Sequence, residues 1–208
     1  MANSNKERSI KHYFHPMSRA VTTNWMLEEL DVPFEEVVVD YMQGENLKSE
    51  FLAINPMGKL PTLTDGDVVI TEAAAICAYL ADKFIDKGMA PPISSSLRGP
   101  YYRYILFSSN TMEPMFTVNQ MEGATFNPQS VGFGDLARVM KTIETMTPEK
   151  NWILEETFSA ADVVFGGTLD FSIQFGWIKE PSERVANYVK RLQARPAYRA
   201  THPESWLI

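Results

Sequence analysis

The sequence predicts an α/β domain with the element order β-α-β-α-β-β-α, followed by an all-helical domain. Short β-prone runs alternate with helical patterns in residues 10–86, whereas strand signals nearly vanish in residues 97–208. Between them, residues 87–96 contain one glycine, two prolines and three consecutive serines, a composition typical of a linker. A mixed unit followed by a helical unit indicates two domains, preceded here by a polar extension over residues 1–9.

The first three elements follow from local patterns. Residues 10–14 form a short apolar run, which predicts a strand. Residues 21–30 carry apolar side chains three and four apart, which predicts a helix. This helix should end before Pro33, because proline cannot continue it. Residues 35–40 include three consecutive valines, a β-branched run typical of a buried strand.

The rest of the first domain contains a short helix, a hairpin and a third helix. Residues 48–54 predict the short helix. Residues 60–63 and 68–70 are β-prone and flank an Asp65-Gly66 pair, which is a strong hairpin signal. The third helix is expected to begin at Glu72. Its apolar residues recur every four positions, at Ile76, Leu80 and Phe84.

Four helices are expected in the second half, over residues 101–121, 136–146, 160–175 and 184–193. The third of these has the clearest start signal. Ser159 can cap its first turn, and Asp162 can reach back to the backbone of the cap. Phe158 supplies the apolar residue that often precedes such a capping box.

Composition excludes several classes of partner. The formal net charge is -7 and no dense Lys/Arg run is present, so a general nucleic-acid surface is not expected. No apolar stretch reaches the about 18 residues that a membrane span needs.

Cys77 is the single cysteine, which excludes an internal disulfide, and its helical setting predicts a small buried hydrophobe. The polar N-terminus lacks the apolar core of a signal peptide, so a cytoplasmic location is expected.

One segment of the first domain carries a specific resemblance. Residues 55–63 read Asn-Pro-Met-Gly-Lys-Leu-Pro-Thr-Leu, and Asp65-Gly66 and then Thr71-Glu72-Ala73 follow. This closely resembles the glutathione-binding segment of the glutathione transferase family, and the element order resembles the thioredoxin fold. The capping box at Ser159 and the Ala-Arg-Pro-Ala-Tyr run at residues 194–198 also resemble that family.

The resemblance implies that this segment holds glutathione as a co-substrate. Pro61 would follow a cis peptide bond, so that the backbone of Leu60 pairs with the cysteinyl backbone of glutathione. Glu72 would bind the γ-glutamyl ammonium, although it also suits a plain first-turn acid. The backbone N–H of Ala73 would hold the γ-glutamyl carboxylate, at a position where family members usually carry serine. Lys59 would pair with the glycyl carboxylate, or is simply a solvated lysine.

The family activates the glutathione thiol, which is mostly protonated at neutral pH because its free pKa is about 8.5. Its hydroxyl donor sits between the first strand and the first helix, here residues 15–20. Ser18 is the first candidate and His15 the second, and a plain N-cap is the alternative role of Ser18. Arg19 adds positive field or is a solvated side chain. The Pro-Met-Ser-Arg run at residues 16–19 resembles bacterial cytosolic members of the family in which a serine is the hydroxyl donor. The class that uses a catalytic cysteine is disfavoured, because no cysteine lies near Arg19.

The second substrate is expected between the two domains, where pockets commonly form. The helix that follows residue 100 is rich in aromatic and methionine side chains, which suit a broad apolar pocket. Four of its residues are taken as candidates: Tyr101, Tyr104, Phe107 and Met112. The implied partners are glutathione and a small apolar electrophile, and the resemblance also implies a homodimer.

Three functions stay open at this point. The first is transfer of glutathione sulfur to apolar electrophiles. The second keeps glutathione but changes the reaction to that of a peroxidase, a dehalogenase or an isomerase. The third is a non-catalytic relative that binds apolar ligands or another protein, because fold does not fix function and Ala73 departs from the family pattern.

Two further motifs are given no function. Residues 132–137 match the dinucleotide fingerprint, but no strand precedes them, so a loop and a helix start are expected. His12 and His15 are three residues apart without a supporting Cys/Asp/Glu cluster, so no metal site is expected.

Overall fold

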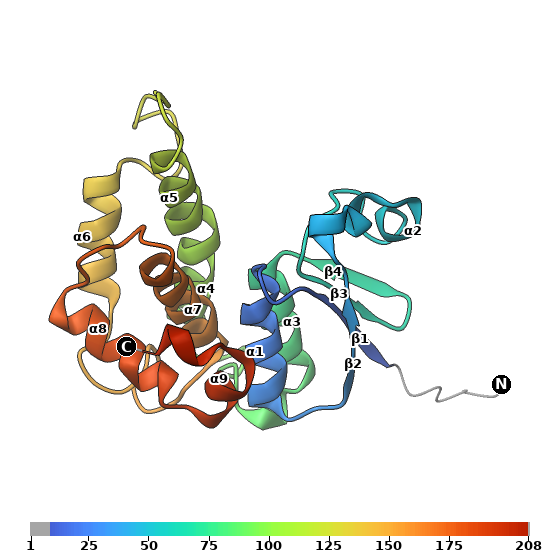
Figure 1. The fold of residues 1–208 in the computed structure, drawn as a ribbon. Coiled ribbons are helices and arrows are strands. Elements are labelled where there is room, and N and C mark those ends of the chain that lie inside the picture. The colour runs from blue at the N-terminus through green and yellow to red at the C-terminus, as the bar shows by residue number, and fades with distance from the viewer. Residues whose placement is uncertain (1–8, 208) are drawn as a thin grey trace.

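A computed structural model describes residues 9–207 of the chain. Its N-terminal part is a four-stranded mixed sheet in the order β2-β1-β3-β4 (Figure 1). The strands are β1 (Ile10–Phe14), β2 (Phe34–Val38), β3 (Thr62–Asp65) and β4 (Val68–Thr71). β1 runs parallel to β2 and antiparallel to β3, which in turn is antiparallel to β4. The four predicted strands, the hairpin and the thioredoxin-like order are confirmed.

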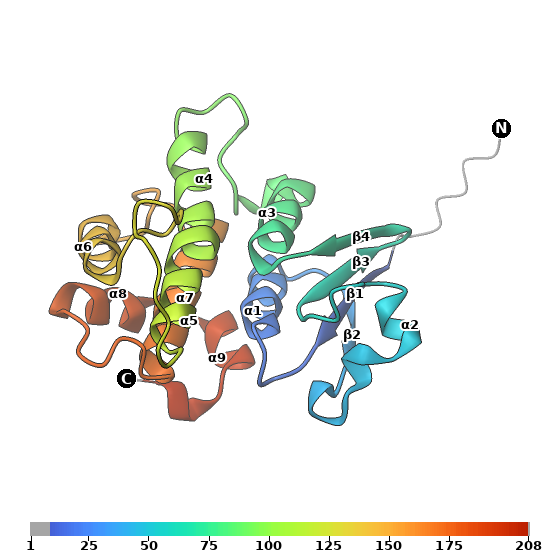
Figure 2. The ribbon, with the colours of Figure 1, turned by 90° about the horizontal axis from the view of Figure 1, so that it is seen from above.

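Two helices form a layer between the sheet and the helical domain, as Figure 2 shows. They are α1 (Ala20–Leu30) and α3 (Ala73–Lys83), and the short α2 (Ser49–Leu52) lies on the other side of the sheet. Because α1 contacts both the sheet and the helices α7 (Ala160–Gln174) and α9 (Pro196–Thr201), its apolar residues are buried on more than one face. Trp25, Met26, Leu27 and Leu30 are all fully buried.

The expectation that the valine run forms a buried strand is wrong. β2 lies at the edge of the sheet, and the side chain of Val38 is 60% exposed. Val39, which follows the strand, is the buried member of the run. β-branched residues favour any pleated strand, so the run predicted the strand correctly but not its place in the sheet.

The C-terminal part is all-helical. Its α-helices are α4 (Arg98–Phe107), α5 (Glu113–Asn119), α6 (Leu136–Met146), α7 (Ala160–Gln174), α8 (Glu183–Gln193) and α9 (Pro196–Thr201). The single helix expected over residues 101–121 is wrong in one respect, because a π-helical turn, Ser108–Met112, separates α4 from α5. Single π-helical turns within α-helices are frequently found at functional sites. α9 was not predicted.

Helix α7 is the centre of this domain, and its capping box is confirmed. The carboxylate of Asp162 accepts hydrogen bonds from the N–H groups of Ser159 (3.0 Å) and Ile153 (2.9 Å). It also accepts one from the hydroxyl of Tyr188 on α8 (2.9 Å). Gly166 lets α8 approach, since a Cβ there would lie 2.2 Å from Cδ1 of Leu192. Only glycine therefore fits this helix contact without a shift of the leucine.

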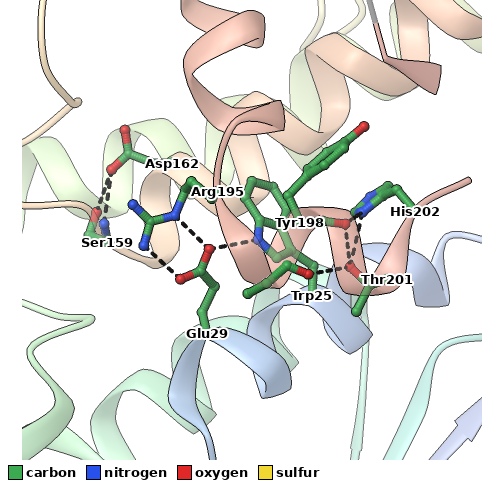
Figure 3. Close-up of polar contacts among 9 residues, drawn as sticks. Trp25, Glu29, Ser159, Asp162, Arg195, Tyr198, Thr201 and His202 are labelled. Atoms are coloured by element: carbon green, nitrogen blue, oxygen red, sulfur yellow. Dashed lines mark hydrogen bonds and ion pairs between the residues drawn. The ribbon is translucent and has the colours of Figure 1, made fainter. Parts of the chain in front are cut away.

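A polar seam joins α1 to the end of the chain (Figure 3). Arg195, which precedes α9, donates two hydrogen bonds to Glu29 on α1, from Nε (2.6 Å) and Nη2 (2.7 Å). The indole Nε1 of Trp25 donates to the same carboxylate (2.8 Å). The guanidinium also lies 3.5 Å from the ring centroid of Phe158. These contacts link the helical domain to the first domain.

Some expectations are not tested by the fold. The limits of the first domain (10–86), the linker (87–96) and the helical domain (97–208) stay predictions. Residues 1–8 of the expected polar extension lie outside the described residues. Within residues 9–207, no helix is long and apolar enough to cross a membrane.

Candidate functional site

Two adjoining cavities lie where the first domain meets the helical domain. The larger has a volume of about 700 Å³ and lies between the start of α3, the loop before β3, and α4 with its π turn. The smaller, of about 230 Å³, adjoins the loop before α1. Arg19, Lys59 and Leu60 line both cavities. Pro61, Glu72 and Ala73 line the larger one, and Ser18 lines the smaller one, so the structure brings all the predicted glutathione-binding residues together.

The loop before β3 presents an unpaired backbone to these cavities. The Leu60–Pro61 peptide bond is cis, as expected. Asn55 fixes the loop, because its amide donates hydrogen bonds to the carbonyl of Lys59 (2.9 Å) and to the hydroxyl of Thr62 (2.9 Å). The N–H and C=O of Leu60 have no hydrogen-bond partner among the described residues. Paired backbone groups are the norm in folded proteins, so this segment can accept a peptide-like ligand.

The start of α3 offers a carboxylate beside free backbone amides. Glu72 has a φ of +67° and a ψ of 120°, a conformation that non-glycine residues rarely adopt and that recurs at ligand sites. Its carboxylate has no partner among the described residues, and it does not cap the helix. The first N–H groups of α3, beginning with Ala73, therefore lack an acceptor within the helix. A ligand with an ammonium and a carboxylate on one carbon matches both features.

The loop before α1 places Ser18 and His15 in different settings. The Ser18 hydroxyl donates to the carbonyl of His15 (2.8 Å) and accepts from the N–H of Ala20 (3.2 Å), so it caps the start of α1. The Nδ1 of His15 accepts from the N–H of Met17 (3.1 Å), and its ring packs edge-on against Tyr41. Ser18 lines the smaller cavity, whereas His15 does not. Helix α1 begins at Ala20, two residues after Ser18.

The side chain of Arg19 crosses from the first domain to the second. It forms an ion pair with Glu113 on α5, with 3.1 Å between Nε and Oε1. Its Nη2 donates to the hydroxyl of Thr168 on α7 (3.0 Å), and its Cζ lies 4.5 Å from the ring centroid of Phe171. Arg19 is therefore a held cation at the junction of the two cavities and not a solvated side chain.

The residues expected to bind the second substrate lie elsewhere. Tyr101 and Met112 are fully buried in the core. The hydroxyl of Tyr104 donates to the carbonyl of Met146 (2.7 Å), and Phe107 packs against the same core. None of the four lines the larger cavity. Side-chain type alone does not show which face of a helix is buried, and the packing of α4 turns this apolar face inward, toward α7.

Another face of the segment that runs from α4 through the π-helical turn to the start of α5 lines the larger cavity. Its residues are Tyr102, Ile105, Leu106, Ser109, Asn110 and Glu113. They are spaced three and four apart, which is one side of a helix. The sequence shows this row of polar and apolar residues, but it does not indicate which side of the helix faces a ligand.

Metal and cysteine chemistry find no support at this site. Within residues 9–207, no group of three or more His, Cys, Asp or Glu side chains could hold a metal ion. Cys77 is fully buried, as expected, and burial raises the pKa of its thiol well above the ordinary value. A thiol kept protonated in the core is not a nucleophile.

Known proteins resemble this chain in both sequence and fold. The family described as "Glutathione S-transferase, N-terminal domain" matches residues 9–82. Glutathione S-transferase F10 of Arabidopsis thaliana is 48% identical over 75 residues, 36% of this chain and 34% of that protein. Glutathione S-transferase F6 of the same plant is 32% identical over 157 residues, 74% of this chain and 68% of that protein.

The fold comparison extends over nearly the whole chain. The crystal structure of a glutathione transferase family member from Pseudomonas fluorescens pf-5 has a TM-score of 0.77. It is 22% identical and covers 96% of this chain and 94% of its own. The likeness to F6 spans most of both sequences, and the fold agrees with it. The chain therefore belongs to the glutathione S-transferase family.

Proposed function

We propose that the protein binds glutathione as a co-substrate and stabilises its thiolate for attack on small apolar electrophiles. One observation carries the proposal: three groups that have no partner among the described residues meet at one cavity. They are the free backbone of Leu60, the unpartnered carboxylate of Glu72 and the uncapped start of α3 at Ala73. Lys59, which is exposed on the same rim, supplies a cation for the glycyl carboxylate.

Glutathione suits this arrangement group by group. Its γ-glutamyl ammonium and carboxylate match Glu72 and the amides of α3, and its cysteinyl backbone matches Leu60. The sulfur then points toward the smaller cavity, where Ser18 and Arg19 lie. The related protein from Pseudomonas fluorescens pf-5 was crystallised with two glutathione bound, which supports a cavity of this kind in the family.

We propose Ser18 as the thiolate donor. Its hydroxyl can turn from the carbonyl of His15 toward the sulfur, because only a 2.8 Å contact within the loop holds its proton. A hydrogen bond to a charged group contributes about 1.5–3 kcal/mol, against about 1 kcal/mol for the neutral one that is lost, and the difference lowers a thiol pKa by about half a unit to one and a half units. Arg19 and the amides at the start of α1 add positive field. His15 stays the second candidate.

Ser18→Ala is expected to lower kcat/KM toward a chlorodinitrobenzene-type electrophile by about threefold to thirtyfold. The thiol then loses its donor and is protonated at neutral pH. Ser18→Thr keeps a hydroxyl and should retain most activity, while His15→Ala controls for changes in the loop. Full activity in Ser18→Ala would show that Ser18 is not the donor.

Ala73→Ser is expected to tighten glutathione binding by about tenfold, measured by isothermal titration calorimetry. A serine hydroxyl at the start of α3 would add one hydrogen bond to the γ-glutamyl carboxylate, worth about 1.5 kcal/mol. Ala137→Ser is the matched control, because Ala137 lies in the exposed first turn of α6, away from the cavity. Equal affinity in wild type and Ala73→Ser would place the carboxylate elsewhere.

The other functions become outcomes of the same measurements. Glutathione binding without transfer, together with peroxide reduction, dehalogenation or isomerisation, would favour the second function, in which glutathione serves a different reaction. A non-catalytic role is supported by the Ser18 proton being used within the loop; absence of glutathione binding at millimolar concentration would favour it.

We further propose a homodimer and a cytoplasmic location. Exposed valines on the edge strand β4 offer a surface for a second copy.

A further inference from the structure

Arg19 is anchored by two neutral contacts that do not depend on its ion pair. The hydroxyl of Thr168 accepts from Nη2 at 3.0 Å, and is itself fixed because it donates to the carbonyl of Val164 at 2.9 Å. The ring of Phe171 supports the guanidinium face, 4.5 Å from Cζ. Both residues lie on α7, the central buried helix. The cation would therefore keep its place if the charge opposite it were removed.

The contact with Glu113 is close but poorly directed. Oε1 lies 3.1 Å from Nε, yet the Nε–H has no hydrogen-bond partner among residues 9–207, because it does not point at the carboxylate. The second contact, from Nη2 to Oε2, is long at 3.5 Å. No acceptor among the described residues takes the Nη1 hydrogens. Glu113 thus acts on Arg19 mainly through its charge, and leaves N–H groups free for a ligand.

Glu113 lines the larger cavity and places a negative charge beside Arg19, which also lines the smaller cavity proposed for the sulfur. A thiolate near Arg19 alone would feel a full positive charge, which favours the charged form and lowers the thiol pKa. A carboxylate 3.1 Å from that cation cancels part of its field. The side chain of Glu113 is 35% exposed, so solvent weakens the effect without removing it.

From this geometry we infer that Glu113 is a positioning residue: it is the counter-ion of Arg19, and through it sets the thiol pKa of bound glutathione. The inference rests on the proposed function. It links the helical domain, which supplies Glu113, Thr168 and Phe171, to the reactivity of a ligand held mainly by the first domain. Arg19 touches the sulfur site, and Glu113 acts through Arg19.

The test is a pH titration of the ultraviolet absorbance of the thiolate in the glutathione complex. Glu113→Gln keeps the shape of the side chain and one acceptor, but loses the charge. The thiol pKa should fall by about half a unit or more, and kcat/KM below that pKa should rise about threefold. Glu113→Asp, which keeps the charge, should restore a pKa near that of the wild type. Glu122→Gln removes an equal charge from an exposed position outside the cavity and should change neither value.

Calorimetry on the same samples distinguishes failure of the proposed function from failure of this inference. Failure of the wild type to bind glutathione overturns the proposed function and this inference together. Normal binding with an unchanged or raised thiol pKa in Glu113→Gln overturns the inference alone. A fall in the pKa of Glu113→Gln that Glu122→Gln reproduces also overturns it, because the effect would then be one of net charge.

Discussion

Glu29→Ala is expected to lower the free energy of unfolding by about 3 kcal/mol, measured by denaturant titration. The Glu29 carboxylate is 7% exposed and accepts three hydrogen bonds, two from Arg195 and one from Trp25 (Figure 3). Its removal leaves a guanidinium and an indole N–H without their acceptor. Breaking one side of a buried pair costs about 3–5 kcal/mol. The cost is expected at the lower end of this range, because the side chain of Arg195 is 25% exposed and keeps part of its hydration.

An exposed ion pair provides the matched control. Lys11 and Glu35 are 2.9 Å apart, with side chains 41% and 54% exposed. Glu35→Ala should therefore change the stability by an amount near the limit of detection. A double-mutant cycle of Glu29→Ala with Arg195→Ala isolates the coupling between the two partners. If Glu29→Ala cost no more than Glu35→Ala, the seam would not hold the domains together.

Features set by neighbouring residues were predictable from the sequence. Pro33 lies beyond the end of α1, Asp65-Gly66 closes the hairpin, and Ser159 with Asp162 starts α7. In each case the chemistry that determines the structure lies within a few residues. The glutathione-binding residues from Lys59 to Ala73 belong to the same class, because they form one nearly continuous motif.

Features set by distant packing were not predictable. The order of strands puts β2 at the sheet edge, and nothing within β2 specifies its neighbours. Tyr101 and Tyr102 are adjacent in sequence, yet one is buried in the core and the other lines the cavity. Successive helical residues point about 100° apart, so the packing of α4 on α7 decides between them. The contact of Arg19 with Glu113 joins residues 94 positions apart, and no local pattern announces it.

A loss of stability in acid is expected from His12, which is fully buried on β1. The hydroxyl of Thr23 donates to the carbonyl of Ala20 (2.9 Å), so it accepts from Nε2 of His12 (2.7 Å). Nδ1 has no hydrogen-bond partner among the described residues, and the rings of Phe14 and Phe34 pack against the imidazole. Burial accordingly lowers the pKa of His12 from 6.5 to about 4.

The direction of the effect follows from which state binds the proton. Between pH 6.5 and about 4 the unfolded chain protonates this histidine and the folded protein does not. The contribution is therefore complete above pH 6.5 and is lost as the pH falls toward 4, by about 3 kcal/mol. His202, whose pKa burial also lowers to about 4, acts in the same direction. Asp162 acts in the opposite direction, because burial raises its pKa to about 6.

The difference between variant and wild type isolates His12, since His202 and Asp162 are common to both proteins. His12→Gln keeps an N–H donor for Thr23 and removes the titrating ring. Its stability, measured by denaturant titration at several pH values, should be lower than that of the wild type at pH 7, because an amide oxygen is then buried without a donor. The gap should close by about 3 kcal/mol as the pH falls from 6.5 to 4. Parallel stability curves over that range would show that His12 is protonated in the folded protein as readily as in the unfolded chain.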